Sequence, residues 1–457
     1  MMLHPPACSY ITTNFFALLV VRLSVVRGKF EPCQSGGTSD LAGRIRRIES
    51  ARKLIEENRE AIDAAIFSDL GRKSSDVPGS LKAIDTVLKH IKDWVQPQKV
   101  PFPEGSSFKE DEDELFLIPE PLGVVLVIGP WNYPLITIIP FIHILAAGNT
   151  VIIKPPDLAP HFSELFGQIV PRYFDERELS VVEGGIPETT ALLEERFDHI
   201  LYTGCPPVGK IIMAAAAKHL TPVTLELGGK SPCYVDDSAD LSIVVEGVKN
   251  MKLSNCGQIC VSIDYILTTV ELKPKLLDAL RQGFDELGDL KNYEGYARIV
   301  NHRHYERLAT LLEKTKGRLA YKSQGEASKD EKYLPVHILE VELDDELLKE
   351  EIFGPILPIV TVPSFDFALS YIKNREKPLA AYIYSQKQEQ IARFLRETSS
   401  GGVKINDNLA TASGLPFGGI GNSGMGRLNG KWGFDTFTHE KPVVARKSIT
   451  KGLNLGL

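Results

Sequence analysis

The chain has 457 residues, of which 43% are hydrophobic and 24% are charged, and its formal net charge is −7. This length and apolar content predict two or three globular domains, and the acidic balance argues against a protein that binds the nucleic-acid backbone. Six cysteines without regular spacing argue against a disulfide framework. Cys256 and Cys260 lack both the CxxC spacing and a histidine cluster, so we predict a reducing compartment and no structural metal.

The first 39 residues form an uncertain N-terminal extension. Residues 11–26 are too short and too often interrupted by polar residues for a transmembrane helix, and no lysine or arginine precedes them as in a signal peptide. No acidic residue comes before Glu31, whereas Arg22, Arg27 and Lys29 are basic. We therefore expect a cytoplasmic protein whose N-terminus is altered or wrongly started, with a mitochondrial presequence as the alternative.

The next segment predicts helices that carry no chemistry. Apolar residues recur at helical spacing over residues 41–70, where Gly71 ends the pattern, and again over residues 81–94. A proline-rich loop follows, and then the acidic run 110–114, which we interpret as a solvated face. The two helical regions are expected to pack on a sheet.

Strands and helices then alternate. A strand at 122–128, a helix at 135–147 and a strand at 151–153 predict a βαβ unit of an open parallel sheet. Such sheets bind ligands beyond the carboxyl ends of their strands, where Asn132 and Lys154 fall. The pattern continues with predicted strands at 179–182, 199–202, 223–227 and 265–270 and predicted helices at 210–219 and 243–253.

Two stretches combine residue types suited to nucleophilic chemistry. Residues 255–261 (NCGQICV) hold Cys260 between a predicted helix and a predicted strand. Residues 225–232 (LELGGKSP) place Glu226 at the end of an apolar strand and before two glycines, where packing alone explains a carboxylate poorly. An isolated cysteine is most often a small buried hydrophobe, but beside a carboxylate it fits a nucleophile with a general base.

Together with residues 129–134 (GPWNYP) and 350–355 (EEIFGP), these stretches resemble the aldehyde dehydrogenase superfamily. Residues 415–419 (LPFGG) and 423–426 (SGMG) point to its class 3 branch, which acts on fatty and aromatic aldehydes. The resemblance runs from about residue 40 to about residue 444, with the motifs in the expected order. It implies an α/β fold with a Rossmann-like parallel-sheet cofactor domain, an α/β catalytic domain and a small β oligomerisation hairpin.

The resemblance also implies how the chain is divided and what it assembles with. The NAD(P)-binding domain is expected at 40–98 and 120–225, the catalytic domain at 226–404, and the oligomerisation segment at 99–119 and 405–457. A homodimer is predicted. The C-terminal residues lack the apolar tail of membrane-bound class 3 relatives, so we do not expect membrane association.

The implied reaction is the oxidation of medium- or long-chain aliphatic or aromatic aldehydes to carboxylic acids with NAD or NADP. Cys260 would attack the carbonyl as a thiolate, and the Asn132 side chain and the Cys260 backbone N–H would stabilise the oxyanion. Glu226 would activate the water that hydrolyses the thioester. Glu351 is an alternative for part of the base role, and Cys256 is a neighbour rather than the nucleophile.

Cofactor contacts are implied at several further positions. In the family, the lysine that corresponds to Lys154 bonds the adenosine ribose, helped by an acidic residue three positions later, which is Asp157 here. Asp157 is one methylene shorter than the usual glutamate, which leaves both NAD and NADP open. Pro206 and Pro207 remove two backbone donors from a loop expected to hold the pyrophosphate, although prolines suit a first helical turn. The other implied cofactor residues are Thr203, Gly204, Gly209, Glu351 and Phe353.

Tyr133 and Phe417, with Trp131, are expected to line an apolar tunnel for the substrate. Between Asp407 and Leu415 the chain is a few residues shorter than class 3 relatives, beside the substrate entrance, so the resemblance does not carry over an aldehyde preference.

Two alternatives remain at this point. An enzyme that passes the thioester to coenzyme A would not need Glu226, which argues against that function. A degenerate relative without catalytic activity is disfavoured by the retained Asn132, Glu226, Cys260 and Glu351, but the N-terminal extension, the two prolines and the shortened segment keep it open.

Overall fold

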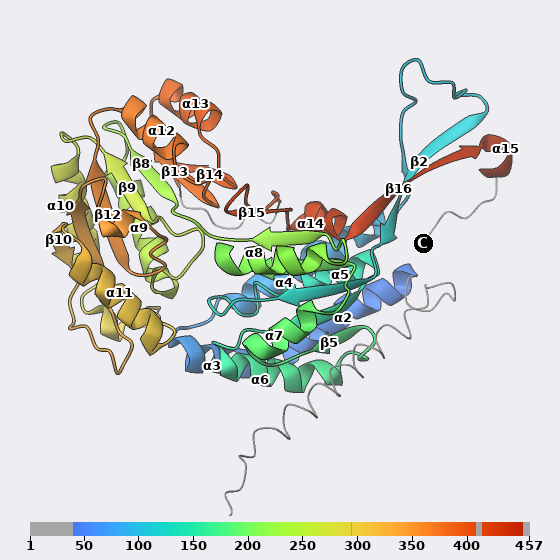
Figure 1. Ribbon diagram of the computed structural model, residues 1–457, viewed down its shortest axis with the longest axis horizontal. Coiled ribbons are helices and arrows are strands. Elements are labelled where there is room, and N and C mark those ends of the chain that lie inside the picture. Colours follow the sequence, from blue (N-terminus) through green and yellow to red (C-terminus); the bar gives the residue numbers. More distant parts are fainter. Residues whose placement is uncertain (1–39, 294, 408–413, 451–457) are drawn as a thin grey trace, which may run out of the picture.

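The computed structural model describes residues 40–293, 295–407 and 414–450, which form two α/β bodies and a projecting β arm (Figure 1). One body contains a six-stranded sheet, the other a seven-stranded sheet, and the arm a three-stranded sheet. The N-terminal extension, with its mitochondrial alternative, and most of the shortened segment before Leu415 lie outside the described residues. The predicted α/β fold class, with a Rossmann-like cofactor body, a catalytic body and a β hairpin, is confirmed.

Among the described residues, three helices precede the first sheet: α2 (Leu41–Glu57), α3 (Arg59–Leu70) and α4 (Asp76–Trp94). The predicted helical stretch 41–70 is divided at Asn58, whose side chain donates to the Leu54 carbonyl at 2.8 Å and so ends α2. Asp40 caps the start of α2, and Gly71 ends α3 with a left-handed backbone (φ 64°), as expected from the sequence.

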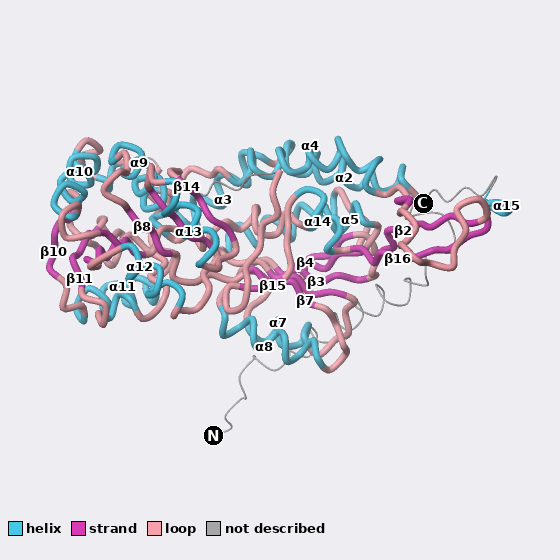
Figure 2. The backbone as a smooth tube through the Cα atoms, turned by 90° about the horizontal axis from the view of Figure 1, so that it is seen from above, coloured by secondary structure: helices cyan, strands magenta, loops and turns pink. Residues whose placement is uncertain are grey.

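The six-stranded sheet forms the core of the first body. In spatial order its strands are β15 (Gly424–Met425), β7 (Val223–Glu226), β6 (His199–Thr203), β3 (Val124–Ile128), β4 (Thr150–Lys154) and β5 (Leu179–Val181). All but the antiparallel edge strand β15 run parallel. Figure 2 shows helices on both faces of this sheet, which explains why β3 and β4 are continuous buried apolar runs.

The helices of this body are α5 (Phe141–Ala147), α6 (Pro160–Ile169), the 3-10 helix η1 (Val170–Arg172), α7 (Ile186–Leu193), α8 (Pro206–Ala217) and α14 (Gly430–Thr436). Two sequence predictions are corrected. The helix predicted at 135–147 begins only at Phe141, because Pro140 has no N–H and its ring disfavours a helical residue before it. The helix predicted at 210–219 begins earlier, at Pro206, since prolines fit the first helical turn.

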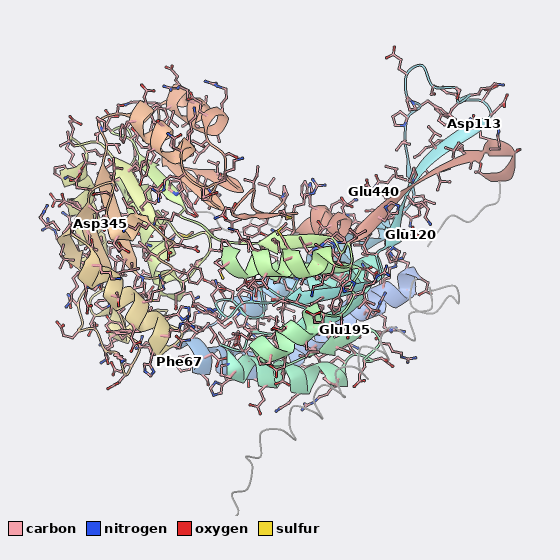
Figure 3. All side chains as sticks on the ribbon, in the orientation of Figure 1. Phe67, Asp113, Glu120, Glu195, Asp345 and Glu440 are labelled. Atoms are coloured by element: carbon pink, nitrogen blue, oxygen red, sulfur yellow. The ribbon has the colours of Figure 1, made fainter. Side chains whose placement is uncertain are left out.

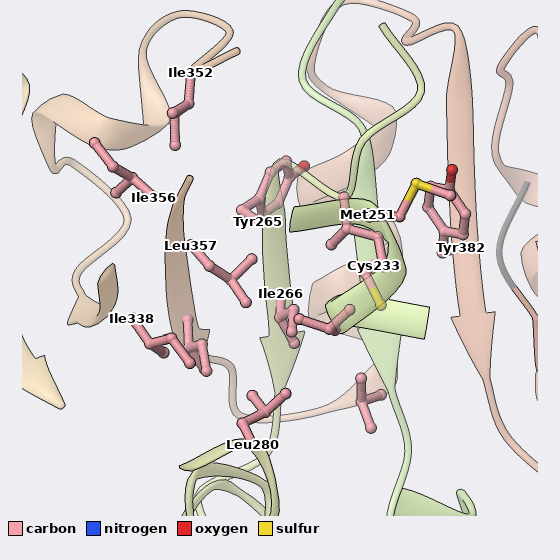
Figure 4. Packing of buried hydrophobic residues seen from close by; sticks show 14 of the residues in the cluster. Cys233, Met251, Tyr265, Ile266, Leu280, Ile338, Ile352, Ile356, Leu357 and Tyr382 are labelled. Atoms are coloured by element: carbon pink, nitrogen blue, oxygen red, sulfur yellow. The ribbon is translucent and has the colours of Figure 1, made fainter. Parts of the chain in front are cut away.

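The second body is built on a seven-stranded sheet. In spatial order its strands are β10 (Arg318–Lys322), β11 (His337–Val341), β12 (Ile356–Thr361), β9 (Tyr265–Thr268), β8 (Pro232–Val235), β13 (Ala380–Tyr384) and β14 (Gly402–Ile405). Its helices are α9 (Leu241–Leu253), η2 (Asn255–Gly257), α10 (Lys273–Asp285), η3 (Leu290–Asn292), α11 (His302–Lys314), η4 (Glu346–Leu348), α12 (Phe365–Lys373) and α13 (Gln388–Glu397). Figure 4 shows Cys233, Ile266 and Leu357 in its fully buried core.

The arm consists of β1 (Gln98–Lys99), β2 (Asp113–Pro121), β16 (Thr438–Arg446) and the short helix α15 (Lys447–Thr450). Asp113, Glu120 and Glu440 mark its length in Figure 3. The solvated face predicted at 110–114 is partly wrong, because Asp113 is buried at the start of β2 and forms an ion pair with Arg446 at 3.0 Å. Residues 110–112 are exposed as expected.

The C-terminal residues are shared between the arm and the first body. Within residues 405–457, β16 and α15 belong to the arm, whereas β15 joins the six-stranded sheet and α14 packs on α4 and α5. The domain boundaries proposed from the sequence stay predictions. Among the described helices, none has the length and apolar content needed to cross a membrane.

Two buried histidines contact this C-terminal segment. His143 lies against Gly433, and the His199 ring lies 5.3 Å from that of Phe437. Burial lowers the pKa of each histidine to about 4. An unfolded histidine has a pKa near ~6.5, so between these values the unfolded chain binds protons that the folded chain does not. Each neutral ring thus contributes fully to the free energy of unfolding above pH ~6.5. This contribution decreases by roughly 3 kcal/mol as the pH falls to about 4.

We therefore expect the urea midpoint of unfolding to decrease when the pH is lowered from about 7 to about 5. His143→Leu removes one of the two rings that must take up a proton, so this variant should show a smaller decrease. Equal decreases in the parent and the variant would contradict the assignment.

Candidate active site

Four of the predicted site residues lie at one edge of the six-stranded sheet. Asn132 follows β3, and the last residues of β4, β6 and β7 are Lys154, Thr203 and Glu226. Thr203 and Glu226 are paired in the register, as are Ile128 and Lys154, so these strand ends are level. This is the carboxyl edge at which open parallel sheets bind ligands.

Cys260 lies on the loop that joins α9 to β9, and left-handed backbone shapes this loop. Asn255 (φ 49°), Cys256 (φ 56°) and Gly257 (φ 70°) adopt it in succession. A β-carbon at Gly257 would collide with a neighbouring backbone carbonyl, so the position requires glycine. The two non-glycine residues carry strain of about 1–3 kcal/mol each. Side-chain bonds offset it: Asn255 donates to the Gln258 carbonyl and Gln258 donates to the Asn255 carbonyl, both at 3.0 Å.

The Asn132 side chain is held against this loop. It is buried, and its amide donates to the Gln258 carbonyl, two residues before Cys260, at 3.0 Å. An amide NH2 group has two N–H donors, so its second donor can serve an oxyanion that forms at Cys260. The structure therefore places the Asn132 amide against the loop that carries Cys260, as the predicted oxyanion role requires.

The electrostatic surroundings of Cys260 keep its thiol protonated. Cys260 is partly exposed. Three causes raise the pKa of its thiol to about 12: first the loss of surrounding water, then the carboxylate of Glu351, then that of Glu226. The backbone N–H groups of Cys260 and Val261 act in the opposite direction. The thiol thus needs a base to become a nucleophile at neutral pH, and two carboxylates are close enough to influence it.

Glu226 is a buried carboxylate without a hydrogen-bond partner among the described residues. It is 3% exposed, and both of its oxygens are unpaired. Burial raises the pKa of Glu226 well above its usual range. The strand β15 and Gly418 cover it: Gly424 pairs with Glu226 in the sheet, and a β-carbon at Gly418 would lie 3.3 Å from a Glu226 oxygen. An unpaired buried carboxylate of raised pKa is suited to act as a general base.

Glu351 and Phe353 approach the same place from the second body. The Glu351 carboxylate lies against Gly228, where a β-carbon would collide with it, and accepts the Gly229 N–H. Burial raises the pKa of Glu351 to about 8. Phe353 has a left-handed backbone (φ 51°), and its ring contacts Trp131 edge-on at 5.5 Å. Glu351 is thus close enough to influence the Cys260 thiol and remains an alternative base, whereas the cofactor role expected for Glu351 and Phe353 stays a prediction.

Lys154 and Asp157 form a second group at the sheet edge. Lys154 is 4% exposed, and its Nζ lies 3.8 Å from the Asp157 carboxylate. Burial lowers the pKa of Lys154, while Asp157 and then Glu188 raise it. Glu188, in the first turn of α7, also accepts the Gly185 N–H at 2.7 Å. The sequence did not indicate Glu188, because no local pattern places α7 beside β4.

In the loop before α8, the backbone N–H groups of two residues already donate to acceptors within the protein. The Gly204 N–H donates to the last carbonyl of β7 at 2.9 Å, and the Cys205 N–H donates to the Tyr202 hydroxyl at 3.1 Å. The two prolines that follow have no N–H. A β-carbon at Gly204 would collide with the Tyr202 side chain, and Gly209 packs closely on the Leu225 and Leu227 side chains. This helix start therefore offers a phosphate fewer donors than usual.

The aromatic residues predicted for the substrate pocket come from two different segments, and their role in a pocket stays a prediction. Tyr133 is partly exposed, with the Arg72 guanidinium 4.6 Å from its ring centre. Phe417 is also partly exposed. Its backbone forms an antiparallel β-bridge with Leu428, and its side chain packs on the core of the second body.

The environment of Cys260 predicts how it reacts before cofactor binds. Alkylation by iodoacetamide should show an apparent thiol pKa well above ~9, the upper end of the usual range. Glu351→Gln should lower this value more than Glu226→Gln, because Glu351 makes the larger contribution. Rates of modification at Cys260, followed by peptide mass spectrometry across pH, would measure it. An apparent pKa near neutrality would contradict the arrangement.

Comparison with known proteins gives the family. Residues 35–443 match the model of the aldehyde dehydrogenase family. A Rattus norvegicus protein named aldehyde dehydrogenase, dimeric NADP-preferring, is 42% identical over 432 residues, which cover 92% of this chain and 94% of the relative. Homo sapiens aldehyde dehydrogenase family 3 member B1 is 40% identical over 434 residues, or 93% and 91% of the two chains.

A solved structure agrees with these relatives. The substrate-bound state of Staphylococcus aureus AldH is 37% identical, has a TM-score of 0.88, and aligns over 93% of this chain and 94% of its own. The class 3 resemblance is thereby confirmed. This chain belongs to the aldehyde dehydrogenase family, whose members are oxidoreductases that convert aldehydes to carboxylic acids with NAD or NADP.

Proposed function

We propose that this chain oxidises medium- or long-chain aliphatic or aromatic aldehydes at Cys260, and that Glu226 drives hydrolysis of the resulting thioester. The observation that carries this proposal is the buried, unpaired Glu226 carboxylate, which influences the Cys260 thiol from the end of β7. Removing a carboxylate from water without giving it a hydrogen-bond partner is costly, so this position indicates a role other than packing.

The first stage forms a carbon–sulfur bond. A nearby carboxylate takes the Cys260 proton, the sulfur attacks the carbonyl carbon, and the carbonyl electron pair moves to oxygen. The oxyanion accepts hydrogen bonds from the Asn132 amide and the Cys260 backbone N–H, an arrangement whose loss typically costs about 10²- to 10³-fold in rate. When the electron pair on oxygen returns, hydride leaves the carbon and a thioester remains.

The second stage consumes water. Glu226 takes a proton from water, whose oxygen attacks the thioester carbon, and the sulfur leaves as the acid is released. Two carboxylates border one thiol here, so the Glu351 alternative for part of the proton transfer is also part of this proposal.

The sheet edge fits a nicotinamide dinucleotide, which supplies the hydride acceptor when bound. Lys154 would hold its adenosine ribose together with Asp157, and the loop from Thr203 to Gly209 would face its pyrophosphate. Glu351 and Phe353 would hold the nicotinamide end. The NADP-preferring name of the rat relative supports NADP, whereas the second carboxylate of Glu188 beside Lys154 disfavours a 2′-phosphate. We therefore propose that both cofactors are used.

We also infer a homodimer, which the dimeric name of the rat relative supports. The projecting arm ends in the edge strand β16, most of whose residues are exposed. Light scattering should give twice the 50.6 kDa mass of the chain.

The function is tested by the formation of reduced NAD or NADP with hexanal, decanal and benzaldehyde, each with and without coenzyme A. We expect aldehyde-dependent reduction with at least one substrate and a carboxylic acid as product. Acyl-coenzyme A as product would favour the acylating alternative. No reduction, together with no cofactor binding, would favour the non-catalytic alternative.

A further inference from the structure

The structure contains a buried ion pair between the two loops that form the active site. Arg72 is 3% exposed and Asp76 is fully buried, and the Arg72 guanidinium bonds the Asp76 carboxylate at 2.9 Å. The same guanidinium donates to the Asn132 carbonyl at 3.2 Å and to the Asn255 side-chain oxygen at 3.0 Å, and it lies over the Tyr133 ring. One side chain thus bonds the loop after β3 and the loop before Cys260.

Asn255 extends this connection. Its Nδ2 donates to the Asn132 carbonyl at 2.9 Å and to the Gln258 carbonyl at 3.0 Å. The Gln258 carbonyl also accepts the Asn132 side-chain amide. The side chain of Asn132 is therefore bonded to the nucleophile loop, and its backbone carbonyl is bonded to the side chains of Asn255 and Arg72.

Asp76 fixes the other end of the same loop. Its second carboxylate oxygen accepts the backbone N–H groups of Leu135 and Ile136 at 3.3 and 3.5 Å. Because Pro140 prevents a helix before Phe141, residues 132–136 have no helix of their own to define their path. The ion pair defines the path of these residues instead. A buried ion pair contributes little net stability compared with well-packed apolar residues.

We propose that Arg72 is a positioning residue, which together with Asn255 fixes the Asn132 amide relative to Cys260 so that the oxyanion is stabilised. This inference rests on the proposed function. Oxyanion donors must lie within a range of about 2.7–3.1 Å from the oxygen, so a small shift of either loop lowers the rate of the chemical step. The planar guanidinium has five N–H donors in a fixed fork. A lysine keeps the charge opposite Asp76 but cannot make the same set of bonds.

The test is a double-mutant cycle of Arg72→Lys and Asn132→Ala in the full-length protein, with aldehyde and cofactor at saturation. Arg72→Lys should lower kcat roughly tenfold, while the Kd for cofactor stays within about twofold. Asn132→Ala should lower kcat about 10²- to 10³-fold. In the double variant, kcat should be within about threefold of Asn132→Ala alone, because the group that Arg72 positions is already absent.

Two further variants keep the result interpretable. Asn255→Gly removes the bonds from the Asn255 side chain, and glycine tolerates the left-handed backbone at this position. It should lower kcat alone, but it should lower kcat little further when combined with Asn132→Ala. This second cycle tests the inference even if Arg72→Lys fails to fold. The matched control is Arg375→Lys, since Arg375 also lies over a tyrosine ring, that of Tyr371 at 5.0 Å, and donates to a backbone carbonyl. It should leave kcat within about twofold of the parent.

Independent effects, with the kcat losses of Arg72→Lys and Asn132→Ala multiplying in the double variant, would overturn the inference. So would an unchanged kcat in both Arg72→Lys and Asn255→Gly. Failure of the proposed function gives a different result, because the parent protein itself would then show no aldehyde-dependent reduction of cofactor.

Discussion

Replacing Cys260 by alanine is expected to reduce aldehyde oxidation by at least roughly 10⁴-fold, the scale seen when a catalytic nucleophile is removed. The reason is chemical: without sulfur attack, the aldehyde carbon has no tetrahedral state from which hydride can leave. Cofactor binding should be unchanged, because Cys260 is not among the residues that would hold the cofactor. Steady-state rates and cofactor titration of the purified variant measure both quantities.

The matched control for this prediction is Cys256→Ala. Cys256 is fully buried, and its thiol interacts with Tyr296 within the core of the second body. Its removal should therefore lower stability without removing a reacting group, and kcat should stay within about tenfold of the parent. Loss of turnover in Cys256→Ala with activity retained in Cys260→Ala would reverse the assignment of the nucleophile.

Glu226→Gln is expected to produce the second largest effect, and a different kind of effect. The glutamine fills the same space but cannot take a proton from water, so hydrolysis should slow about 10²- to 10⁴-fold. Formation of the thioester does not need that water. Rapid mixing with aldehyde and cofactor should therefore show a burst of about one reduced cofactor for each active site, followed by almost no turnover.

Glu351→Gln separates the two carboxylates. If Glu226 is the base for water, Glu351→Gln should retain multiple turnovers, even where cofactor affinity falls. A burst in Glu351→Gln and none in Glu226→Gln would instead assign the water-activating role to Glu351.

The sequence predicted the parts of the fold that depend on local pattern. Continuous apolar runs indicated β3 and β4, because parallel strands covered on both faces are largely apolar. The continuing alternation of strands and helices indicated β6 and β7. The motifs around Glu226 and Cys260 indicated the chemistry, because a carboxylate at an apolar strand end is hard to explain by packing. The family resemblance then indicated the roles of Asn132 and Lys154.

Other features could not be predicted, because they depend on contacts between distant segments. Nothing near Arg72 in the sequence distinguishes it from an exposed charge at the end of a helix, and its burial arises only when α3 meets the loops around Asn132 and Asn255. Glu188 likewise reaches Lys154 only because β4 and α7 are neighbours in the fold. Periodicity also missed the late start of α5, since the apolar spacing continues through Pro140.

The central claim is that Cys260 carries the acyl group and that Glu226 releases it as the acid. The most direct measurement is intact and peptide mass spectrometry of Glu226→Gln after mixing with decanal and cofactor. We expect a mass increase equal to one decanoyl group, located on Cys260 and absent when cofactor is omitted. An acyl group on any other residue, or none at all despite reduction of the cofactor, would contradict the claim.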